Sequence, residues 1–389
     1  MQKDRQFLLL RLAAGLSLLL ALVNHLLPPK PFAMTQLLFD YQFGPVRRGM
    51  VGEILNLFTG DEVSRGEVYL AAAVITLAGA FGFYLLLKRL MPLELVGGWL
   101  LLILSLNSFA FASFVGNTGY LDGLLLALVA LALASDGARV FGLMLRLVIA
   151  GLGVMVHENM LPYFTILIGF DLWLTGQRAG WSGARAFLAA LAPAFVALAV
   201  LVVLTGAAAV QSGDAAAFAG YLEGKAAFWL DPTSTDVAGR SIGSNFALMA
   251  ELRGTTKYRA WLLFDGLPLA LMSLWLYWLA MRLMPKDEPW FTRLLLAGVL
   301  LAPISLNVIA FDVVRFGVAS VLSGFLAIGL LIRHRPWARE RLQAVLTWPH
   351  FLVVLVLNVN IFTIQINIGA FHVSQFPWIL VTQLRWLMP

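Results

Sequence analysis

Long apolar runs, repeated along the whole chain, constrain this sequence more than any other feature. Hydrophobic residues make up 60% of the 389 positions and charged residues only 12%, whereas a soluble domain has about 45–50% apolar and about 25% charged residues. A run of about 20 apolar residues is long enough to cross a bilayer as a helix. The sequence therefore excludes a soluble globular protein and predicts an all-α, polytopic transmembrane protein.

The apolar runs that are bounded by charged or turn residues predict about eleven spans. They cover residues 7–27, 67–87, 94–113, 118–135, 140–156, 160–175, 186–206, 260–281, 294–311, 313–332 and 348–368. The first run follows Lys3 and Arg5, as a signal peptide would, but it is long and lacks a small-residue cleavage site. We expect it to be an uncleaved anchor with the N-terminus in the cytoplasm.

Lys and Arg concentrate in the short loops that would then face the cytoplasm, such as 88–92 and 282–290. This bias follows the positive-inside rule, and an odd number of spans places the C-terminus outside. No basic surface with interleaved aromatic residues stands out, so we expect membrane lipids rather than nucleic acid as partners. The compact loops and this topology favour a bacterial inner membrane, with the periplasmic side outside.

We expect one membrane domain over residues 1–389, with two long outer loops. These loops, 28–66 and 207–259, are predicted to carry interfacial helices, and the segment 369–389 is predicted to be an interfacial C-terminal segment. Long loops in compact proteins tend to carry function.

Four acidic residues fall at the predicted outer ends of different spans. They are Asp40, Asp122, Glu158 and Asp312. Charges at such depths cost several kcal/mol (about 2.5–3.5 at a helix centre) and usually mark function, so we expect these carboxylates to face one outward cavity. The alternative for each is a helix cap that offsets the helix dipole.

Two adjacent arginines, Arg47 and Arg48, lie outside, against the overall charge bias. Guanidinium groups bind phosphate through two parallel hydrogen bonds, so a lipid-linked phosphate is their expected ligand. The alternative is that both side chains reach the outer lipid headgroups.

Two further groups have open interpretations. Asp312 and Arg315 stand three residues apart, as in a structural ion pair, or else Arg315 holds a phosphate while Asp312 orients it. His157 and Glu158 are adjacent but lack the HExxH spacing of a zinc site. No metal site is predicted, and the absence of cysteine excludes disulfides and thiolate ligands.

These features resemble the GT-C superfamily of integral membrane glycosyltransferases, which use polyprenyl-phosphate or polyprenyl-diphosphate sugars. The resemblance rests on Asp40 in a long first outer loop, an expected surface helix over Arg47 to Phe58, the motif Asn117 to Gly123 that contains Asp122, and a larger outer loop downstream. It covers about the first 180 residues. Asp40 is followed by Tyr41 rather than by a second acid, which leaves the use of a divalent metal open and the cofactor unknown.

The resemblance implies transfer of a sugar from a polyprenyl-phosphate carrier to a hydroxyl of a glycan, lipid or protein acceptor, with inversion, on the periplasmic face. It implies Asp40 as general base, the arginines at positions 47, 48 and 315 as phosphate ligands, and Tyr41 as a residue that stacks on a sugar ring. The side chains of Asp122, His157 and Glu158 would orient hydroxyls. The alternatives are a polysaccharide polymerase or ligase that acts on lipid-diphosphate glycans, a transporter or flippase of lipid-linked substrates, and a non-catalytic scaffold.

Overall fold

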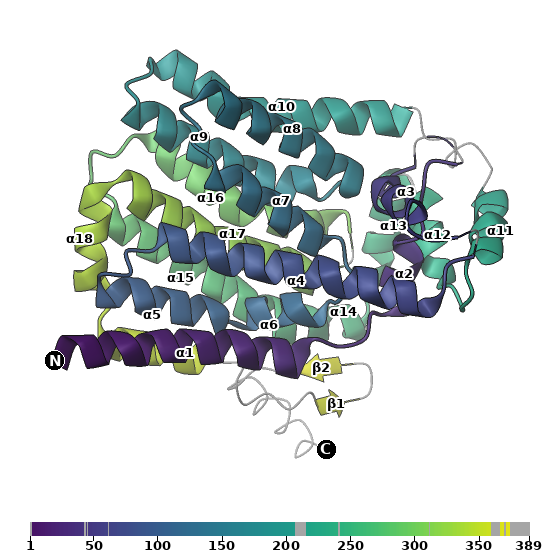
Figure 1. The fold of residues 1–389 in the computed structure, drawn as a ribbon, viewed down its shortest axis with the longest axis horizontal. Helices are drawn as coiled ribbons and strands as arrows, with labels where there is room; N and C mark the ends of the chain where they lie inside the picture. The colour runs from purple at the N-terminus through teal and green to yellow at the C-terminus, as the bar shows by residue number, and fades with distance from the viewer. Residues whose placement is uncertain are drawn as a thin grey trace. The chain divides into compact units, whose positions relative to one another are not determined.

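The computed structural model describes residues 2–42, 44, 46–60, 62–206, 215–239, 242–310, 312–358, 366–368 and 371–373. Helices account for most of this chain, and they are joined by short turns (Figure 1). One short antiparallel hairpin pairs strand β1 (Ile366–Ile368) with strand β2 (Phe371–Val373). The predicted all-helical class is thus correct apart from this hairpin.

The chain divides into two compact units. The first unit comprises residues 1–25, 84–114 and 247–389, and the second comprises residues 26–83 and 115–246. Helix α4 (Arg65–Leu90) contributes its first part to the second unit and its last part to the first.

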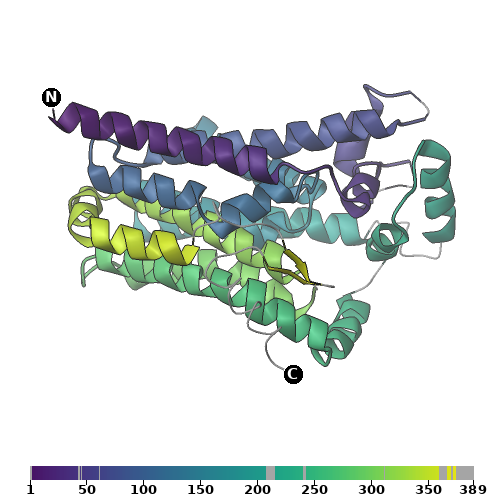
Figure 2. The ribbon, with the colours of Figure 1, turned by 90° about the horizontal axis from the view of Figure 1, so that it is seen from below.

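The first unit has helix α17 (Val313–His334) at its centre, with nearly every side chain buried. Helices α15 (Leu267–Leu283) and α16 (Trp290–Ser305) pack on it, and α1 (Gln2–His25) runs beside α5 (Val96–Leu106) (Figure 2). The remaining helices of this unit are α6 (Phe109–Gly116), α13 (Ile242–Arg253), α14 (Thr256–Trp261), η3 (Leu262–Gly266), η4 (Leu306–Val308), α18 (Pro336–Val345) and α19 (Trp348–Asn358). Helices α6 and α13 each begin or end a few residues across the boundary between the units.

The second unit is built on α8 (Val140–Val156), α9 (Ile166–Arg178) and α10 (Gly183–Gly206), which pack against one another. Helix α7 (Asp122–Ala134) packs on α8 and α9, and η1 (Leu161–Thr165) precedes α9 directly. Four short helices complete the unit: α2 (Pro31–Gln36), α3 (Gly49–Asn56), α11 (Ala215–Lys225) and α12 (Pro232–Gly239).

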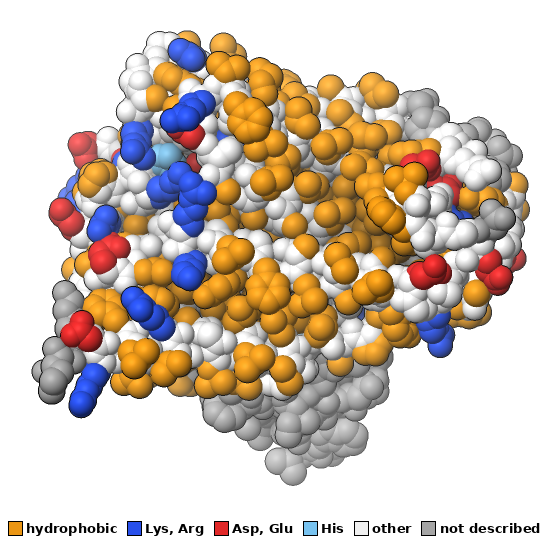
Figure 3. Space-filling model, in the orientation of Figure 1, with side chains coloured by type: hydrophobic (Ala, Val, Ile, Leu, Met, Phe, Trp, Pro, Cys, Tyr) orange, Lys and Arg blue, Asp and Glu red, His pale blue; other side chains and the backbone are white. Residues whose placement is uncertain are grey.

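Five helices within the described part of the chain are long and apolar enough to cross a membrane, or six if the bent pair α18 and α19 forms one span. Four further apolar helices, α5, α7, α8 and α15, are shorter. Large apolar side chains stay exposed along α1, α4 and α10, and Figure 3 shows hydrophobic groups over much of the visible surface. Because water would penalise such a surface while lipid would not, the chain has the character of a helical membrane protein.

Each of the eleven predicted apolar runs contains a helix, although several of these helices are shorter than a full crossing. A count of eleven spans therefore stays a prediction. The last run, 348–368, is helical only as far as Asn358, and residues 359–365 lie outside the described residues. Most of the predicted interfacial segment 369–389 also lies outside them.

Both predicted outer loops contain helices. Residues 28–66 hold α2 and α3, and α3 lies inside the range Arg47 to Phe58 where a surface helix is expected. Residues 207–259 hold α11, α12 and α13. Helix α2 begins with Pro31 at its first position, where a missing N–H costs nothing.

Candidate functional site

The segment around Asp40 is held in place by tight packing in the second unit. Leu37, Leu38 and Phe39 are fully buried between α2 and α3. Gly52 of α3 lies so close that a Cβ atom there would stand 2.0 Å from the carbonyl oxygen of Phe39. Only a glycine fits this contact, so α3 fixes the backbone that carries Asp40.

Asp40 is completely buried, and its carboxylate is surrounded by donors. Oδ2 accepts hydrogen bonds from Lys225 Nζ at 2.8 Å, Tyr221 Oη at 2.5 Å and Asn56 Nδ2 at 3.0 Å. Oδ1 accepts one from the backbone N–H of Gln42 at 3.1 Å. A buried carboxylate with an adjacent cation and several donors is stabilised in its charged form.

Lys225, the last residue of α11, connects the two loops that are predicted to lie outside. Its side chain is 6% exposed, and its Nζ also donates to the carbonyl of Leu38 at 3.1 Å. Two backbone hydrogen bonds connect the same loops. The N–H of Val63 donates to the carbonyl of Lys225 at 2.7 Å, and the N–H of Ala227 donates to the carbonyl of Val63 at 3.0 Å. Helix α11 and the residues directly after it are therefore joined to the segment 38–63 around Asp40.

The pKa values of the site follow from this arrangement. Burial raises the pKa of Asp40, but the hydrogen bonds from Lys225, Tyr221 and Asn56 more than offset burial, so the net pKa lies below its ordinary value. Burial and the Asp40 carboxylate raise the pKa of Tyr221. Asp40 is therefore an anion and Tyr221 a neutral phenol at neutral pH.

Arg48 and Glu158 form an ion pair that joins the first outer loop to the end of α8. Arg48 Nε donates to Glu158 Oε2 at 3.0 Å, and Nη2 donates to Oε1. Burial raises the pKa of Glu158, but Arg48, then His157 and then Arg47 hold the pKa well below its ordinary value. Arg48 adopts a left-handed backbone (φ 70°) just before α3, a conformation that is uncommon for residues other than glycine.

His157, next to Glu158, is 1% exposed. Its Nδ1 accepts a hydrogen bond from the N–H of Asn159 at 3.1 Å and stands 3.3 Å from Glu158 Oε2. His157 thus contributes to the polar end of α8 and lies in contact with the Glu158 carboxylate.

Tyr41 and Arg47 lie on the same loop. The ring of Tyr41 packs against Gly49, where an added Cβ would come within 2.8 Å of it. Burial, followed by the charge of Glu53, raises the pKa of Tyr41. Arg47 is half-buried and adds positive potential at Glu158.

Asp122 is the first residue of α7 and is half-buried. A carboxylate in the first turn offsets the positive end of the helix dipole, as the capping interpretation expects. The preceding turn uses Gly119 at φ +83°, and the N–H of Gly119 donates to Thr76 Oγ1 at 3.1 Å.

Asp312 and Arg315 belong to the first unit. Asp312 caps α17 by accepting from the N–H of Arg315 at 3.3 Å, and it pairs with Arg315 Nη1 at 3.1 Å. This geometry matches the structural ion pair, which was one of the two interpretations. The other predicted site residues, Asp40, Tyr41, Arg47, Arg48, Asp122, His157 and Glu158, all belong to the second unit.

Sequence reasoning missed three groups that bind Asp40: Asn56, Tyr221 and Lys225. The latter two lie about 180 residues further along the chain, and a single lysine or tyrosine in a long loop gives no local signal. Among the described residues, no group of three or more His, Cys, Asp or Glu side chains could hold a metal ion.

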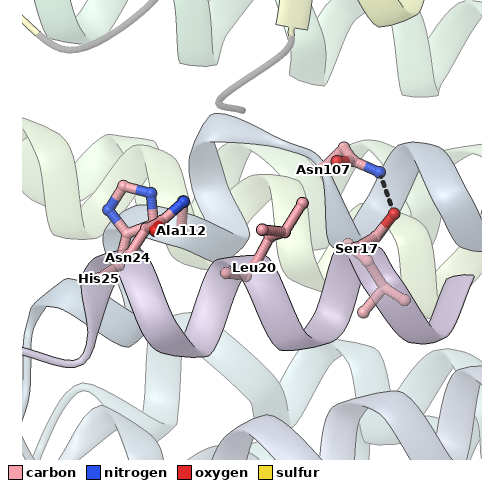
Figure 4. Close-up of a pocket in the computed structure, with 8 residues that line it drawn as sticks. Ser17, Leu20, Asn24, His25, Asn107 and Ala112 are labelled. Carbon is pink, nitrogen blue, oxygen red and sulfur yellow. Dashed lines mark hydrogen bonds between the residues drawn. The ribbon is translucent and has the colours of Figure 1, made fainter. Parts of the chain in front are cut away.

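A small pocket lies elsewhere, in the first unit, between α1 and the α5–α6 region. Ser17, Asn24, His25 and Asn107 line it with apolar neighbours, and Asn107 Nδ2 donates to Ser17 Oγ at 2.6 Å (Figure 4). It contains none of the predicted site residues.

No family model, curated protein or solved structure matches this chain. The functional argument therefore rests on the residues of the second unit.

Proposed function

We propose that this protein is a membrane glycosyltransferase that moves a sugar from a polyprenyl-phosphate carrier to an acceptor hydroxyl. The observation that carries the proposal is the Asp40 centre, an ionised carboxylate enclosed by both outer loops, with Arg47 and Arg48 on the same segment. A base and phosphate-binding cations within one loop are the two functions that this reaction requires. The acceptor is a glycan, a lipid or a protein, and the proposed location is the periplasmic face of a bacterial inner membrane.

The reaction is a single displacement. The acceptor oxygen attacks the anomeric carbon, the bond from that carbon to the carrier phosphate oxygen breaks, and polyprenyl phosphate leaves with the bonding electrons. Asp40 takes the proton of the acceptor hydroxyl. Oδ1 suits this step better than Oδ2, because Oδ1 has one donor and Oδ2 already has three.

Asp40 is buried in this structure, so an acceptor must displace its cover. Tyr221 bonds both Asp40 and the side chain of Gln42, which is exposed. We assign this pair the role of a cover that opens to admit the hydroxyl. Excluding water in this way would protect the activated sugar from hydrolysis.

The leaving phosphate gains negative charge as its bond to the sugar breaks. Arg47 and Arg48 supply the countercharge, and Glu158 orients the guanidinium of Arg48 through Nε and Nη2. Asp122, His157 and Tyr41 are assigned to the hydroxyls and the ring of the sugar. Arg315 pairs with Asp312 in the other unit, so no role in the reaction is proposed for either residue.

The test uses purified protein in lipid nanodiscs, with radiolabelled polyprenyl-phosphate sugars and crude envelope acceptors. Replacement of Asp40 by Asn keeps the shape but removes the base, so we expect transfer to fall by about 10²–10⁴-fold. The matched control is Asp236→Asn on the exposed surface of α12, which should leave transfer unchanged.

Two outcomes would replace the proposal. Full activity of Asp40→Asn, with loss of activity on changing Arg47 or Arg48, would favour a polymerase or ligase that relies on arginines. Binding of the carrier without any transfer by the wild type would favour transport or a scaffold.

A further inference from the structure

The side-chain amide of Gln36, in the second unit, is buried and makes no hydrogen bond with the described residues. Gln36 is the last residue of α2 and is 1% exposed. Neither its Nε2 nor its Oε1 has a hydrogen-bond partner among the described residues. Burying an amide without hydrogen-bond partners is unfavourable, and a bound ligand would supply the missing partners.

The direction of Gln36 follows from its neighbours one turn earlier on α2. The ring of Phe32 stacks on Tyr120 at 6.0 Å between centroids, and Ala33 lies within 3.6 Å of the position that a Cβ on Gly119 would take. Residues three and four apart share a helix face. Gln36 therefore faces the segment that leads into Asp122.

A second buried polar atom in this unit also lacks a hydrogen-bond partner among the described residues. The hydroxyl of Tyr41, one residue after Asp40, is buried and has no partner among the described residues. Two polar groups that lack partners thus flank the short segment that ends at Asp40.

The chemistry of the amide selects the kind of ligand. A carboxamide presents two N–H donors and a carbonyl acceptor. A phosphate offers only acceptors, so Oε1 would face another acceptor, and a prenyl chain would leave both atoms without partners. A sugar hydroxyl both donates and accepts, and two neighbouring hydroxyls satisfy both ends of the amide.

We infer that Gln36 binds hydroxyl groups of the transferred sugar, with the Tyr41 hydroxyl as a second contact. This inference rests on the proposed function and assigns the sugar portion of the donor to the side of α2 on which Gln36 lies, next to the segment that carries Asp40. Gln36 is a binding residue in this arrangement, and the proton transfer stays with Asp40.

The experiment measures binding without an acceptor, so that no transfer is needed. Wild type and Gln36→Met in nanodiscs are titrated with polyprenyl phosphate that carries one hexose and with bare polyprenyl phosphate. Met keeps the length of Gln and removes both polar ends. We expect the affinity for the hexose-bearing carrier to fall about thirtyfold, because two hydrogen bonds that each contribute about a factor of five are lost. The affinity for the bare carrier should stay unchanged.

Thermal unfolding without ligand supplies an independent readout. Because the amide has no partner to lose, Gln36→Met should leave the melting temperature unchanged or raise it. The matched control is Asn107→Leu in the first unit, whose amide donates to Ser17 and to the carbonyl of Ile103. This control should lower the melting temperature and leave hexose binding intact.

Three results would overturn the inference: an equal loss of affinity for both carriers, no loss for either, or a clear fall in the melting temperature of Gln36→Met. Failure of the proposed function looks different. In that case the wild type binds the hexose-bearing carrier in a Gln36-dependent way but transfers the hexose to no acceptor.

Discussion

At the scale of single residues, a fully buried ion pair joins Arg146 of α8 to Asp171 of α9, each with a side chain 1% exposed. Asp171 Oδ2 accepts from Nη2 of Arg146 at 2.6 Å and from Nε at 3.0 Å. Ser135 and the carbonyl of Gly142 take the remaining donors. A pair 25 residues apart on two helices has no local pattern in the sequence.

Loss of one partner should be costly here. Arg146→Leu leaves the Asp171 carboxylate buried without a cation, which typically costs about 3–5 kcal/mol, so we expect a large drop in thermal stability in detergent. The double variant Arg146→Leu with Asp171→Leu should recover most of that loss. The control Arg139→Leu breaks an exposed pair with Asp136 and should have little effect. A double variant as unstable as the single one would mean that packing, and not charge, accounts for the loss.

The candidate site shows the same limit of sequence reasoning. Asp40, Arg48 and Glu158 stand out as charges at predicted span ends, and the structure places all three in one unit. Lys225 and Tyr221 complete the Asp40 centre only because α11 folds back onto the first loop. A contact of this kind is set by tertiary packing, and no spacing in the sequence encodes it.

At the scale of elements, the start of α7 depends on a left-handed turn at Gly119. A Cβ atom there would lie 2.9 Å from the Cβ of Ala72 and 3.1 Å from that of Pro29. The turn therefore brings α2, α4 and α7 close together, and α2 carries Gln36 while α7 begins with Asp122. The sequence shows the motif Asn117 to Gly123 but gives no information about the residues that pack against it.

Gly119→Ala should combine a backbone cost with a steric one. A left-handed backbone costs a residue other than glycine about 1–2 kcal/mol, and the contact with Ala72 adds to that cost. Gly180→Ala is the matched control, because Gly180 has a similar φ of +71° but open space around it. We expect a larger drop in melting temperature for Gly119→Ala than for Gly180→Ala. Equal drops in melting temperature would show that the close packing of α2 and α4 against the turn does not make Gly119→Ala more destabilising.

At the scale of the whole molecule, hydropathy predicts where helices form but not how many of them cross the bilayer. The runs 67–87, 186–206 and 313–332 correspond to α4, α10 and α17, each of which is long enough to span. The run 94–113 is split between α5 and α6, which are too short individually. Apolar composition is shared by spanning helices and by helices buried among other helices, so composition alone does not separate the two.

The absence of cysteine in the chain allows a clean test of topology. Glu223→Cys in the second predicted outer loop should react with a membrane-impermeant maleimide on intact cells. Lys286→Cys in a predicted inner loop should react only after permeabilisation; both positions are exposed in the structure. Labelling of both positions from the same side would contradict the predicted topology and the assignment of the Asp40 centre to the outer face.

The most direct test of outer-face sugar transfer uses sealed right-side-out vesicles without nucleotide. A hexose on polyprenyl phosphate and an envelope acceptor are added outside, and the products are identified by mass spectrometry. We expect glycosylated acceptor and bare polyprenyl phosphate in equal amounts, and neither product with Asp40→Asn. Movement of the intact lipid-linked hexose to the inner leaflet, with no glycosylated acceptor, would contradict a glycosyltransferase and identify a transporter.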